Sequence, residues 1–324
     1  MRRGTHAVLW LAFLAGAVAI GLVSSSQHVL TLAIQTMTLA ALATSWNILG
    51  GYAGQISLGH AAFFGLGALI TRELWLGGRS LVLAALVAVA VTAAVAAIVG
   101  IPMLRFRDIY FAIGTLALGV AVFITAGNLR PGITSLRADA LRDYDFSGRY
   151  FMTLGVLLAA VLMSVWLKHS KVGLGMMAVR DDEEAAGATG VNAFAHKMIA
   201  FIVSASFAAL AGSAFAYFSA SYFPNFPFSV VWTFEAILVV FIGGVGTIVG
   251  PILGSFFFVV GRAALPSGID EFQVVLFGAL FIVVVLLFPG GLAGAAQRLL
   301  GTASKRSPSP ADRPTKQRGG KELV

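Results

Sequence analysis

The spacing of charged side chains is the feature that most constrains this chain. Residues 4–71 contain no Asp, Glu, Lys or Arg. A helix that crosses a bilayer needs about 20 mostly apolar residues, so this stretch has room for about three crossings. Further charge-poor runs occupy residues 81–103, 109–129, 150–167, 198–234, 236–261 and 272–297. The sequence therefore predicts a polytopic integral membrane protein.

Composition agrees with lipid as the main solvent. The 324 residues are 58% hydrophobic and 11% charged, with a mean hydropathy of +0.90, which leaves too little polar surface for a water-soluble globule. Cysteine is absent, which excludes disulfides, thiolate chemistry and Cys-ligated zinc. The net charge of +8 does not indicate nucleic acid, because Lys and Arg collect in the cytoplasmic loops of membrane proteins.

The apolar runs predict an all-α fold with about ten transmembrane helices. We expect them at 7–23, 29–49, 57–71, 80–103, 109–127, 150–168, 197–218, 231–246, 251–265 and 272–288. If both termini are inside, fifteen of the 22 Lys and Arg residues are cytoplasmic and seven external, so the positive-inside rule predicts an N-in, C-in topology. The first run imitates a signal peptide, but no A-x-A-type site ends it, so we interpret it as an uncleaved helix.

The expected organisation is one permease domain, residues 1–300, followed by a basic cytoplasmic tail at 301–324 that is rich in Pro and Ser and predicted to be disordered. The external segment 128–149 has nearly balanced charges and is either a solvated loop or a docking surface. The segment 169–196 is the only sizeable internal loop between spans.

Searches for catalytic motifs find nothing. The chain lacks G-x-x-x-x-G-K-[ST], G-x-S-x-G and H-E-x-x-H, and no two of its five histidines have helical ligand spacing. We therefore predict no catalytic residues, no metal site and no cofactor bound by this chain, so that any ATP and Mg must be bound by partner subunits. An ion-coupled carrier is disfavoured, because Glu235 is better interpreted as an interfacial carboxylate than an ion relay, and Arg262 as a snorkelling side chain.

The most informative membrane segment contains glycines and polar side chains near the second predicted span. Its glycines weaken a continuous helix, and its polar groups supply hydrogen bonds that an interrupted helix needs in hydrocarbon. One interpretation is a broken helix beside the translocation pathway; the other is a Gly-rich helix contact with a tight turn. The pathway candidates are Asn47, Gly54, Gln55, Ser57, Gly59 and His60.

A second Gly-rich break follows near residue 243. Because proline suits the first turn of a helix, a tight inside turn is favoured here over a substrate contact. The residues of this predicted turn are Gly243, Gly244, Gly246, Gly250 and Pro251.

The internal loop carries a short helix signal. Asp181 has the position of an N-cap with Glu184 three residues later, and Gly190 suits the left-handed residue that ends a helix. A helix this short is unstable alone, so it packs either on the protein's own helix ends or in a groove of another subunit. The candidate coupling residues are Arg180, Asp181, Glu183, Glu184, Ala185, Ala186 and Gly190.

Three of these segments together resemble the LivM-type permeases of branched-chain amino acid ABC importers. They are residues 51–63 (GYAGQISLGHAAF), 179–197 and 243–251 (GGVGTIVGP), and residues 108–116 (DIYFAIGTL) are similar to that family's fifth-span entry. Order and spacing agree over roughly residues 29–290. The family often shows Thr-Gly-Gly after the fifth span, whereas this chain has Arg130-Pro131-Gly132-Ile133-Thr134.

The resemblance implies a transporter subunit of the inner membrane that works with a second permease, two ATP-binding subunits and a periplasmic solute-binding protein. It implies import of branched-chain amino acids, urea, short amides or aromatic acids by alternating access, with the internal loop docked on an ATPase groove. The alternative function is an ion-coupled secondary transporter or facilitator for a small neutral solute. A structural scaffold explains the apolar spans but not the two Gly-rich breaks.

Overall fold

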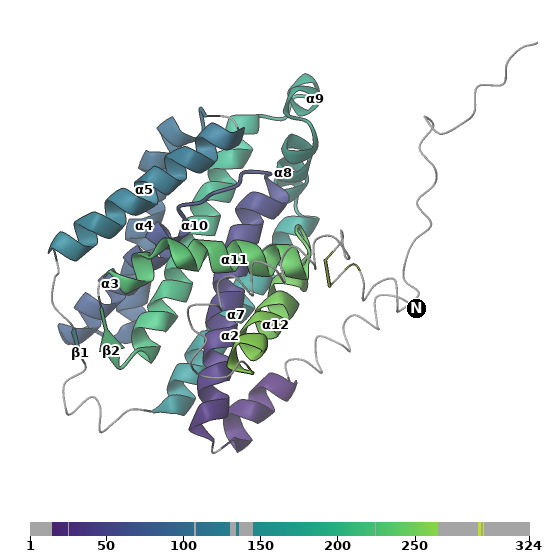
Figure 1. The fold of residues 1–324 in the computed structure, drawn as a ribbon. Helices are drawn as coiled ribbons and strands as arrows, with labels where there is room; N and C mark the ends of the chain where they lie inside the picture. The colour runs from purple at the N-terminus through teal and green to yellow at the C-terminus, as the bar shows by residue number, and fades with distance from the viewer. Residues whose placement is uncertain are drawn as a thin grey trace, which may run out of the picture.

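The computed structural model describes residues 15–24, 26–106, 108–129, 134–135, 145–223, 225–264, 291–292 and 294. Within these ranges the fold is all-α, as predicted, with one minimal strand pair (Figure 1). A helical segment at residues 15–23 precedes α2 Gln27–Asn47, η1 Ile48–Tyr52, α3 His60–Leu76, α4 Leu81–Met103, α5 Asp108–Leu129, β1 Thr134–Ser135, α7 Phe146–His169, α8 Lys171–Asp181, α9 Glu183–Ala188, α10 Ala193–Phe218, β2 Ser221–Tyr222, η2 Phe226–Phe228, α11 Val230–Gly243 and α12 Gly250–Ala263.

Five described helices are long and apolar enough to cross a membrane: α2 with η1, α4, α5, α7 and α10. The helices α11 and α12 have 14 residues each, or about 21 Å, less than the roughly 30 Å hydrocarbon core. The count of ten spans and the N-in, C-in topology stay predictions. The predicted span 272–288, the tail 301–324 and most of segment 128–149 lie outside the described residues.

The predicted boundaries shift most at α3, which was expected at 57–71 and runs from His60 to Leu76. Its start is later because the preceding residues form an irregular segment. Its end is later because Arg72, which we expected outside the membrane helix, is 1% exposed and hydrogen-bonded inside the protein. A charge that is satisfied internally does not have to end a helix.

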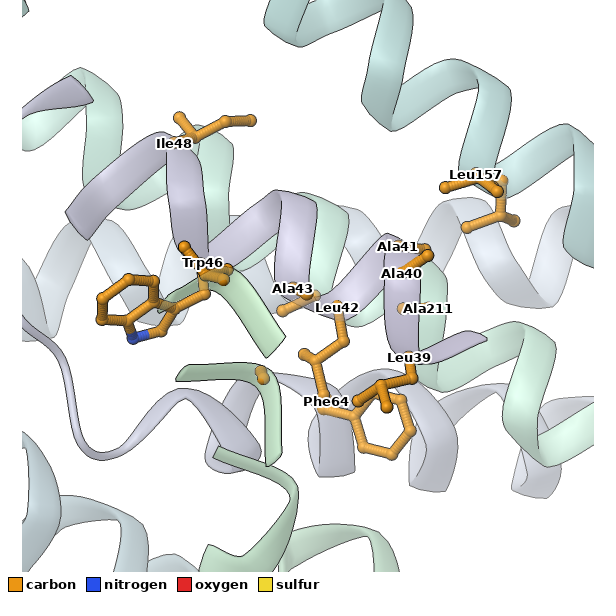
Figure 2. Packing of buried hydrophobic residues seen from close by; sticks show 14 of the residues in the cluster. Leu39, Ala40, Ala41, Leu42, Ala43, Trp46, Ile48, Phe64, Leu157 and Ala211 are labelled. Carbon is orange, nitrogen blue, oxygen red and sulfur yellow. The ribbon is translucent and has the colours of Figure 1, made fainter. Parts of the chain in front are cut away.

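The centre of the molecule is formed by α2 and α10. In their most apolar windows 67% and 56% of residues are buried, against 28% in α4 and α5, which lie at the periphery. Figure 2 shows this core, where small and large apolar side chains of α2 meet Phe64 of α3, Leu157 of α7 and Ala211 of α10. A side chain at Gly67 would overlap the backbone at Ala209, so α3 and α10 are in close backbone contact, as small residues allow between membrane helices.

Two buried arginines hold the C-terminal end of α10. Arg72 Nη1 donates to the carbonyls of Ala216 and Ser219 at 2.9 Å each, and Arg149 Nε donates to that of Tyr217 at 2.9 Å. These cations lie where the helix dipole is negative and the last carbonyls lack helical partners. At the other end of α10 lies Lys197, so α10 separates the two sets of charges that the positive-inside count assigns to opposite faces.

One strand pairing ties part of segment 128–149 to the rest of the protein. Thr134 and Ser135 of β1 pair antiparallel with Tyr222 and Ser221 of β2. This pairing was not predicted, because two-residue strands leave no periodicity to detect.

Candidate functional site

The first Gly-rich region is an interruption between two helices; we call residues 47–60 the break segment. After α2 the chain makes the π-turn η1, and α3 starts only at His60. Gly54 has a φ of +72°. The Leu49 carbonyl accepts from both Ala53 N and Gln55 N, at 3.3 and 3.1 Å. The helix is therefore interrupted at the position where the glycines predicted it.

Side chains from three helices satisfy the irregular backbone. Trp46 Nε1 of α2 donates to the Ser57 carbonyl at 2.8 Å, and Thr115 Oγ1 of α5 accepts from Leu58 N at 3.1 Å. At the start of α3, Thr233 Oγ1 of α11 accepts from Ala61 N at 2.8 Å. Non-helical backbone at membrane depth is stable only with such partners or with water, so these contacts hold the break segment in shape.

His60 anchors the break segment to the core. Its Nε2 lies 3.2 Å from Ser45 Oγ on α2 and 3.0 Å from Ser204 Oγ on α10. Both hydroxyls already donate to carbonyls, Ser45 to Leu42 and Ser204 to Ser45, which leaves them as acceptors. The arrangement fits the tautomer with its hydrogen on Nε2, donating to both.

Five of the six predicted pathway residues are buried within the protein. Asn47, Ser57, Gly59 and His60 are buried, Gln55 is 9% exposed, and Gly54 is exposed. A side chain at Gly59 would overlap the Thr115 carbonyl, so α5 touches the break segment at that point. In this conformation the buried residues are packing contacts between helices, and their place beside a pathway stays a prediction.

Asn47 connects the two Gly-rich regions. Its Oδ1 accepts from Gly246 N at 2.8 Å, and its Nδ2 donates to the Thr247 carbonyl at 2.9 Å. One amide thus forms a two-point contact with backbone about 200 residues away in sequence. We call residues 243–251 the turn segment.

The turn segment joins α11 to α12. Gly244 and Gly246 have φ of +116° and +73°, and Thr247 Oγ1 accepts from Gly250 N at 3.0 Å. A side chain at Gly243 would overlap the Gly250 backbone, and Pro251 lies in the first turn of α12. The five predicted residues therefore form a tight turn; the side of the membrane that it faces stays a prediction.

The segment 169–196, which we call the loop, contains two helices where we predicted one. The unpredicted helix, α8, begins after Ser170, whose Oγ accepts from Gly173 N at 3.0 Å. Its Gly173, Gly175, Met176 and Val179 are buried, so it lies against the protein. A reading based on apolar spans misses this helix, because its 11 residues are too few to cross a membrane and two of its four buried residues are glycines.

The short helix α9 is capped one residue later than we predicted. Asp182, and not Asp181, is its N-cap, with its carboxylate accepting from Glu184 N and Ala185 N at 2.9 Å each. The capping-box spacing of Asp181 and Glu184 is therefore wrong. Asp181 pairs instead with Arg180, 2.7 Å from Asp181 Oδ1 to Nη2, while Glu183 and Glu184 occupy the first turn near the positive helix end.

The end of α9 is the predicted glycine stop. Gly190 has a φ of +87°, Gly190 N donates to the Gly187 carbonyl at 3.0 Å, and Val191 N donates to the Ala186 carbonyl at 3.0 Å. These two bonds make a Schellman motif, which favours glycine at the left-handed position. Within the helix Ala185 continues the turn and Ala186 is buried.

An ion pair holds α9 to α10. Lys197 Nζ lies 2.7 Å from Glu183 Oε2, and the Lys197 side chain is 6% exposed. The chain therefore supplies part of the support that so short a helix needs. The outer face of α9 remains open, since Glu184 and Ala185 are exposed.

The break segment, the turn segment and the loop meet around one side chain. Arg180 Nη1 donates to the Gly51 carbonyl at 2.7 Å. A Cβ at Gly54 would lie 2.8 Å from Arg180 Cγ, and one at Gly246 would lie 3.3 Å from Arg180 Nη1. The three segments that carry the family resemblance are thus one junction in space.

A polar pocket of about 300 Å³ opens at this junction. Among its lining residues are Gln55, Asp108, Arg180, Asp181 and Lys197. Asp108 begins α5 with a φ of +46°, an uncommon conformation for a non-glycine residue.

A larger cavity of about 760 Å³ lies between residues 16–20, α2, α7 and α12. Its lining is apolar, and its two hydroxyl groups are already used: Thr36 Oγ1 donates to the Leu32 carbonyl, and Tyr150 Oη donates to the Ala17 carbonyl, both at 2.7 Å. A charged or zwitterionic solute needs oriented polar partners, so we do not assign this cavity to solute.

Sequence reasoning missed the residues that other helices contribute. The Thr247 backbone carbonyl accepts from Asn47. The hydroxyls of Thr115, Ser204 and Thr233 bond to Leu58, to His60 and to Ala61 at the start of α3. Each is a single hydroxyl in an apolar run, where it also serves ordinary helix packing. Only the positions of Thr115 and Thr247 inside segments that carried the resemblance gave any signal.

Comparison with known proteins places this chain among transport permeases. Residues 28–285 match the family described as branched-chain amino acid transport system / permease component. The high-affinity branched-chain amino acid transport system permease protein LivM of Salmonella typhimurium is 29% identical over 298 residues, which cover 81% of this chain and 69% of the relative. LivM of Escherichia coli is 28% identical over 304 residues, or 82% and 70%.

Shorter matches extend to other permeases. The permease protein LivH of Salmonella typhimurium is 27% identical over 138 residues, which cover 42% of this chain and 44% of LivH. The xylose/arabinose import permease protein XylH of Sulfolobus acidocaldarius is 31% identical over 178 residues, or 52% and 48%. No solved structure matches.

These relatives are transport permeases and not enzymes, as the absence of catalytic motifs predicted. Their similarity and the apolar helices make this chain a multi-pass membrane protein. The family match spans the break segment, the turn segment and the loop between them, and we conclude that the chain belongs to the branched-chain amino acid transport system permease family.

Proposed function

We propose that this chain is the membrane-spanning subunit of an ATP-driven importer that moves branched-chain amino acids, or related amino-acid or amide solutes, into the cytoplasm. The observation that carries the proposal is the junction around Arg180. It brings the loop that resembles an ATPase-docking element into direct contact with both interruptions of the membrane helices.

The partners follow from the family. LivM and LivH relatives both match this chain, which supports a pair of homologous permeases. We propose a heterodimer with a second permease, two ATP-binding subunits that hold ATP and Mg, and a periplasmic solute-binding protein, in a bacterial inner membrane. The exposed outer face of α9 is the surface we assign to an ATPase groove.

Alternating access is the mechanism we propose. ATP-driven closure of the ATPase subunits would move the loop, and the permeases would shift between outward-open and inward-open states. We assign the break segment to the wall of the translocation pathway, because its backbone is irregular and its Gly54 and Ile56 are exposed. No described residue of the break segment is charged, so solute selection falls to the binding protein.

The solute is the finer part of the proposal. One relative is named as a sugar import permease, so similar permeases carry the names of different solutes. We therefore use leucine as the first probe and do not assume that it is the solute. Exchanging the binding protein for one of different specificity, with its docking surface retained, should change the transported solute. An unchanged solute range would place the selectivity in the membrane.

The decisive experiment measures uptake of radiolabelled leucine into cells that express the complete complex. A Walker A Lys→Ala change in the ATPase subunits should abolish uptake, whereas a protonophore added at constant ATP should leave it intact. Uptake that survives loss of ATPase activity and stops with the protonophore would instead support the ion-coupled carrier. Uptake by this chain alone would support a facilitator.

A further inference from the structure

The Arg180 side chain is held by a charge partner and by a backbone acceptor at the same time. Its Nε and Nη2 donate to Asp181 Oδ1 at 3.0 and 2.7 Å, and its Nη1 donates to the Gly51 carbonyl at 2.7 Å. The carboxylate uses one edge of the planar guanidinium, which fixes the direction of the remaining donor. Arg180 is thus a directed link from the end of α8 to the π-turn η1.

The receiving end of this link is shaped for it. The stem of Arg180 passes over Gly54, where a side chain would lie 2.8 Å from Cγ. Gly51 lies equally close to the turn segment, since a Cβ on it would be 2.8 Å from Gly246 N. Asn47, four residues earlier, then joins the same backbone to Gly246 and Thr247.

These contacts form one continuous series from the loop to the α11–α12 hairpin. It runs from α8 through Arg180 to Gly51, and from the same turn of helix through Asn47 to the turn segment. Its contacts are hydrogen bonds of defined direction, so relative movement of α8 and α2 must stretch or break them. The polypeptide backbone itself cannot carry such a movement directly from Arg180 to Gly51, because 129 residues separate them in sequence.

We infer that Arg180 is the positioning residue through which movement of the α8–α9 loop reaches the break segment. The inference rests on the proposed function and adds the point of transmission to it. ATPase docking belongs to the exposed face of α9, whereas transmission belongs to Arg180, so the two are separable. Loss of Arg180 leaves the ATPase subunits bound and uncouples their hydrolysis from transport.

The experiment compares Arg180→Gln and Arg180→Lys with Lys171→Gln, which removes a charge from an exposed position of the same helix. Each variant is purified as the complete complex with its ATPase subunits and reconstituted in vesicles with binding protein and leucine. The measurements are ATPase co-purification, basal hydrolysis, leucine-stimulated hydrolysis and leucine transported per ATP.

We expect Arg180→Gln to keep co-purification and basal hydrolysis while leucine transported per ATP falls about tenfold, as suits the loss of a charge-assisted hydrogen bond. Arg180→Lys should fall between, since an ammonium reaches one acceptor without the planar fork. Lys171→Gln should match the unaltered complex.

Three results would overturn the inference. If Arg180→Gln transports as much leucine per ATP as Lys171→Gln, Arg180 is only a structural tie, and the proposed function stands. If the ATPase subunits fail to co-purify with Arg180→Gln, Arg180 belongs to the docking surface. If Arg180→Gln does not accumulate, Arg180→Lys decides: full coupling in that variant rejects a directed two-sided link. Failure of the unaltered complex to transport leucine would count against the proposed solute and not against the link.

Discussion

At the scale of single residues, Asn47 is the contact whose loss is simplest to predict. Leu in its place has similar size but leaves Gly246 N–H and the Thr247 carbonyl without this partner. Unpaired groups of this kind cost about 1–3 kcal/mol each when buried, and these two are partly buried, so we expect Asn47→Leu to lose about 2 kcal/mol. Thermal unfolding in detergent checks it, with exposed Asn225→Leu as the control. Equal unfolding midpoints for the two variants would show that the two Asn47 hydrogen bonds do not contribute to stability.

Cysteine labelling separates pathway residues from packing residues. The chain has no cysteine, so each introduced thiol is its only one. Gln55 Oε1 and Ser57 Oγ are buried without a partner among the described residues, and such groups are expected to find water or solute in another state. His60 is anchored through Nε2 to two hydroxyls.

With a membrane-impermeant thiol reagent we expect Ile56→Cys to be labelled without ATP, since Ile56 is 48% exposed. Gln55→Cys and Ser57→Cys should gain labelling only during ATP hydrolysis, and His60→Cys should stay protected. Protection of all three buried positions in every state would leave only helix packing for the break segment.

Residue type was enough to single out the polar side chains that form hydrogen bonds at the junction, but it did not identify the groups to which they bond. Asn47 and His60 stood out because polar groups are rare in apolar spans. Apart from Ser45 on α2, their partners come from α10 and the turn segment, about 140 to 200 residues away. One sequence carries no record of such pairings. The Ser204 hydroxyl looks like that of an ordinary helix residue, and the Thr247 partner of Asn47 is a backbone carbonyl, which residue identity does not mark.

At the scale of elements, α9 offers a matched pair of glycines. A Cβ at Gly187 or Gly190 meets nothing within 4 Å, so space does not distinguish them. Gly187 is inside the helix, where Ala is better by about 0.5–1 kcal/mol, whereas Gly190 has a φ of +87°, where Ala costs about 1–2 kcal/mol. Gly187→Ala should therefore strengthen α9 and Gly190→Ala should weaken it.

The readout for this pair is the affinity of the ATPase subunit for the permease in detergent. A change of about 1 kcal/mol in the binding free energy corresponds to about fivefold in Kd. We expect Kd to fall for Gly187→Ala and to rise for Gly190→Ala. Asp182→Ala, which removes the cap, should resemble Gly190→Ala. If all three variants bind ATPase equally well, α9 is a connector and does not dock.

Helices that are defined by a long apolar run could be predicted, whereas helix ends that depend on a capping residue could not. The long helices α4, α5 and α10 follow directly from charge-free runs. The N-cap of α9 was wrong by one residue, because Asp181 and Asp182 are equally good caps in sequence and only the pairing of Asp181 with Arg180 separates them. Helix α8 was missed because two of its four buried residues are glycines, which leave only a weak apolar stripe.

At the scale of the whole molecule, stability should depend on the end of α10. Arg72 donates to the carbonyls of Ala216, Ser219 and Ala220. Hydrogen bonds to charged groups are worth about 1.5–3 kcal/mol each, so Arg72→Gln should lose at least about 3 kcal/mol of stability. Exposed Arg79→Gln is the control, and fluorescence-detected size exclusion after heating is the measurement. Equal melting of both variants would show that the guanidinium contributes little.

The sequence predicts the fold class of the protein but not how its helices are arranged. Hydropathy identified a helical membrane protein, since helices satisfy all their backbone groups within lipid. It did not show that α2 and α10 are central while α4 and α5 are peripheral, because all four have similar apolar length. Burial of Arg72 and Arg149 was the opposite of the expectation for charged loop residues.

The capping of α10 by Arg72 has a consequence for the order of assembly during synthesis. Arg72 leaves the ribosome 144 residues before its Ala216 acceptor. At synthesis rates of about 5–20 residues per second, that interval is roughly 7–29 s. During it the end of α3 carries a guanidinium with no carbonyl of α10 to receive it. We therefore expect the insertion machinery to keep the end of α3 near water or within its own channel until α10 arrives, and α3 and α10 to enter the lipid as a pair.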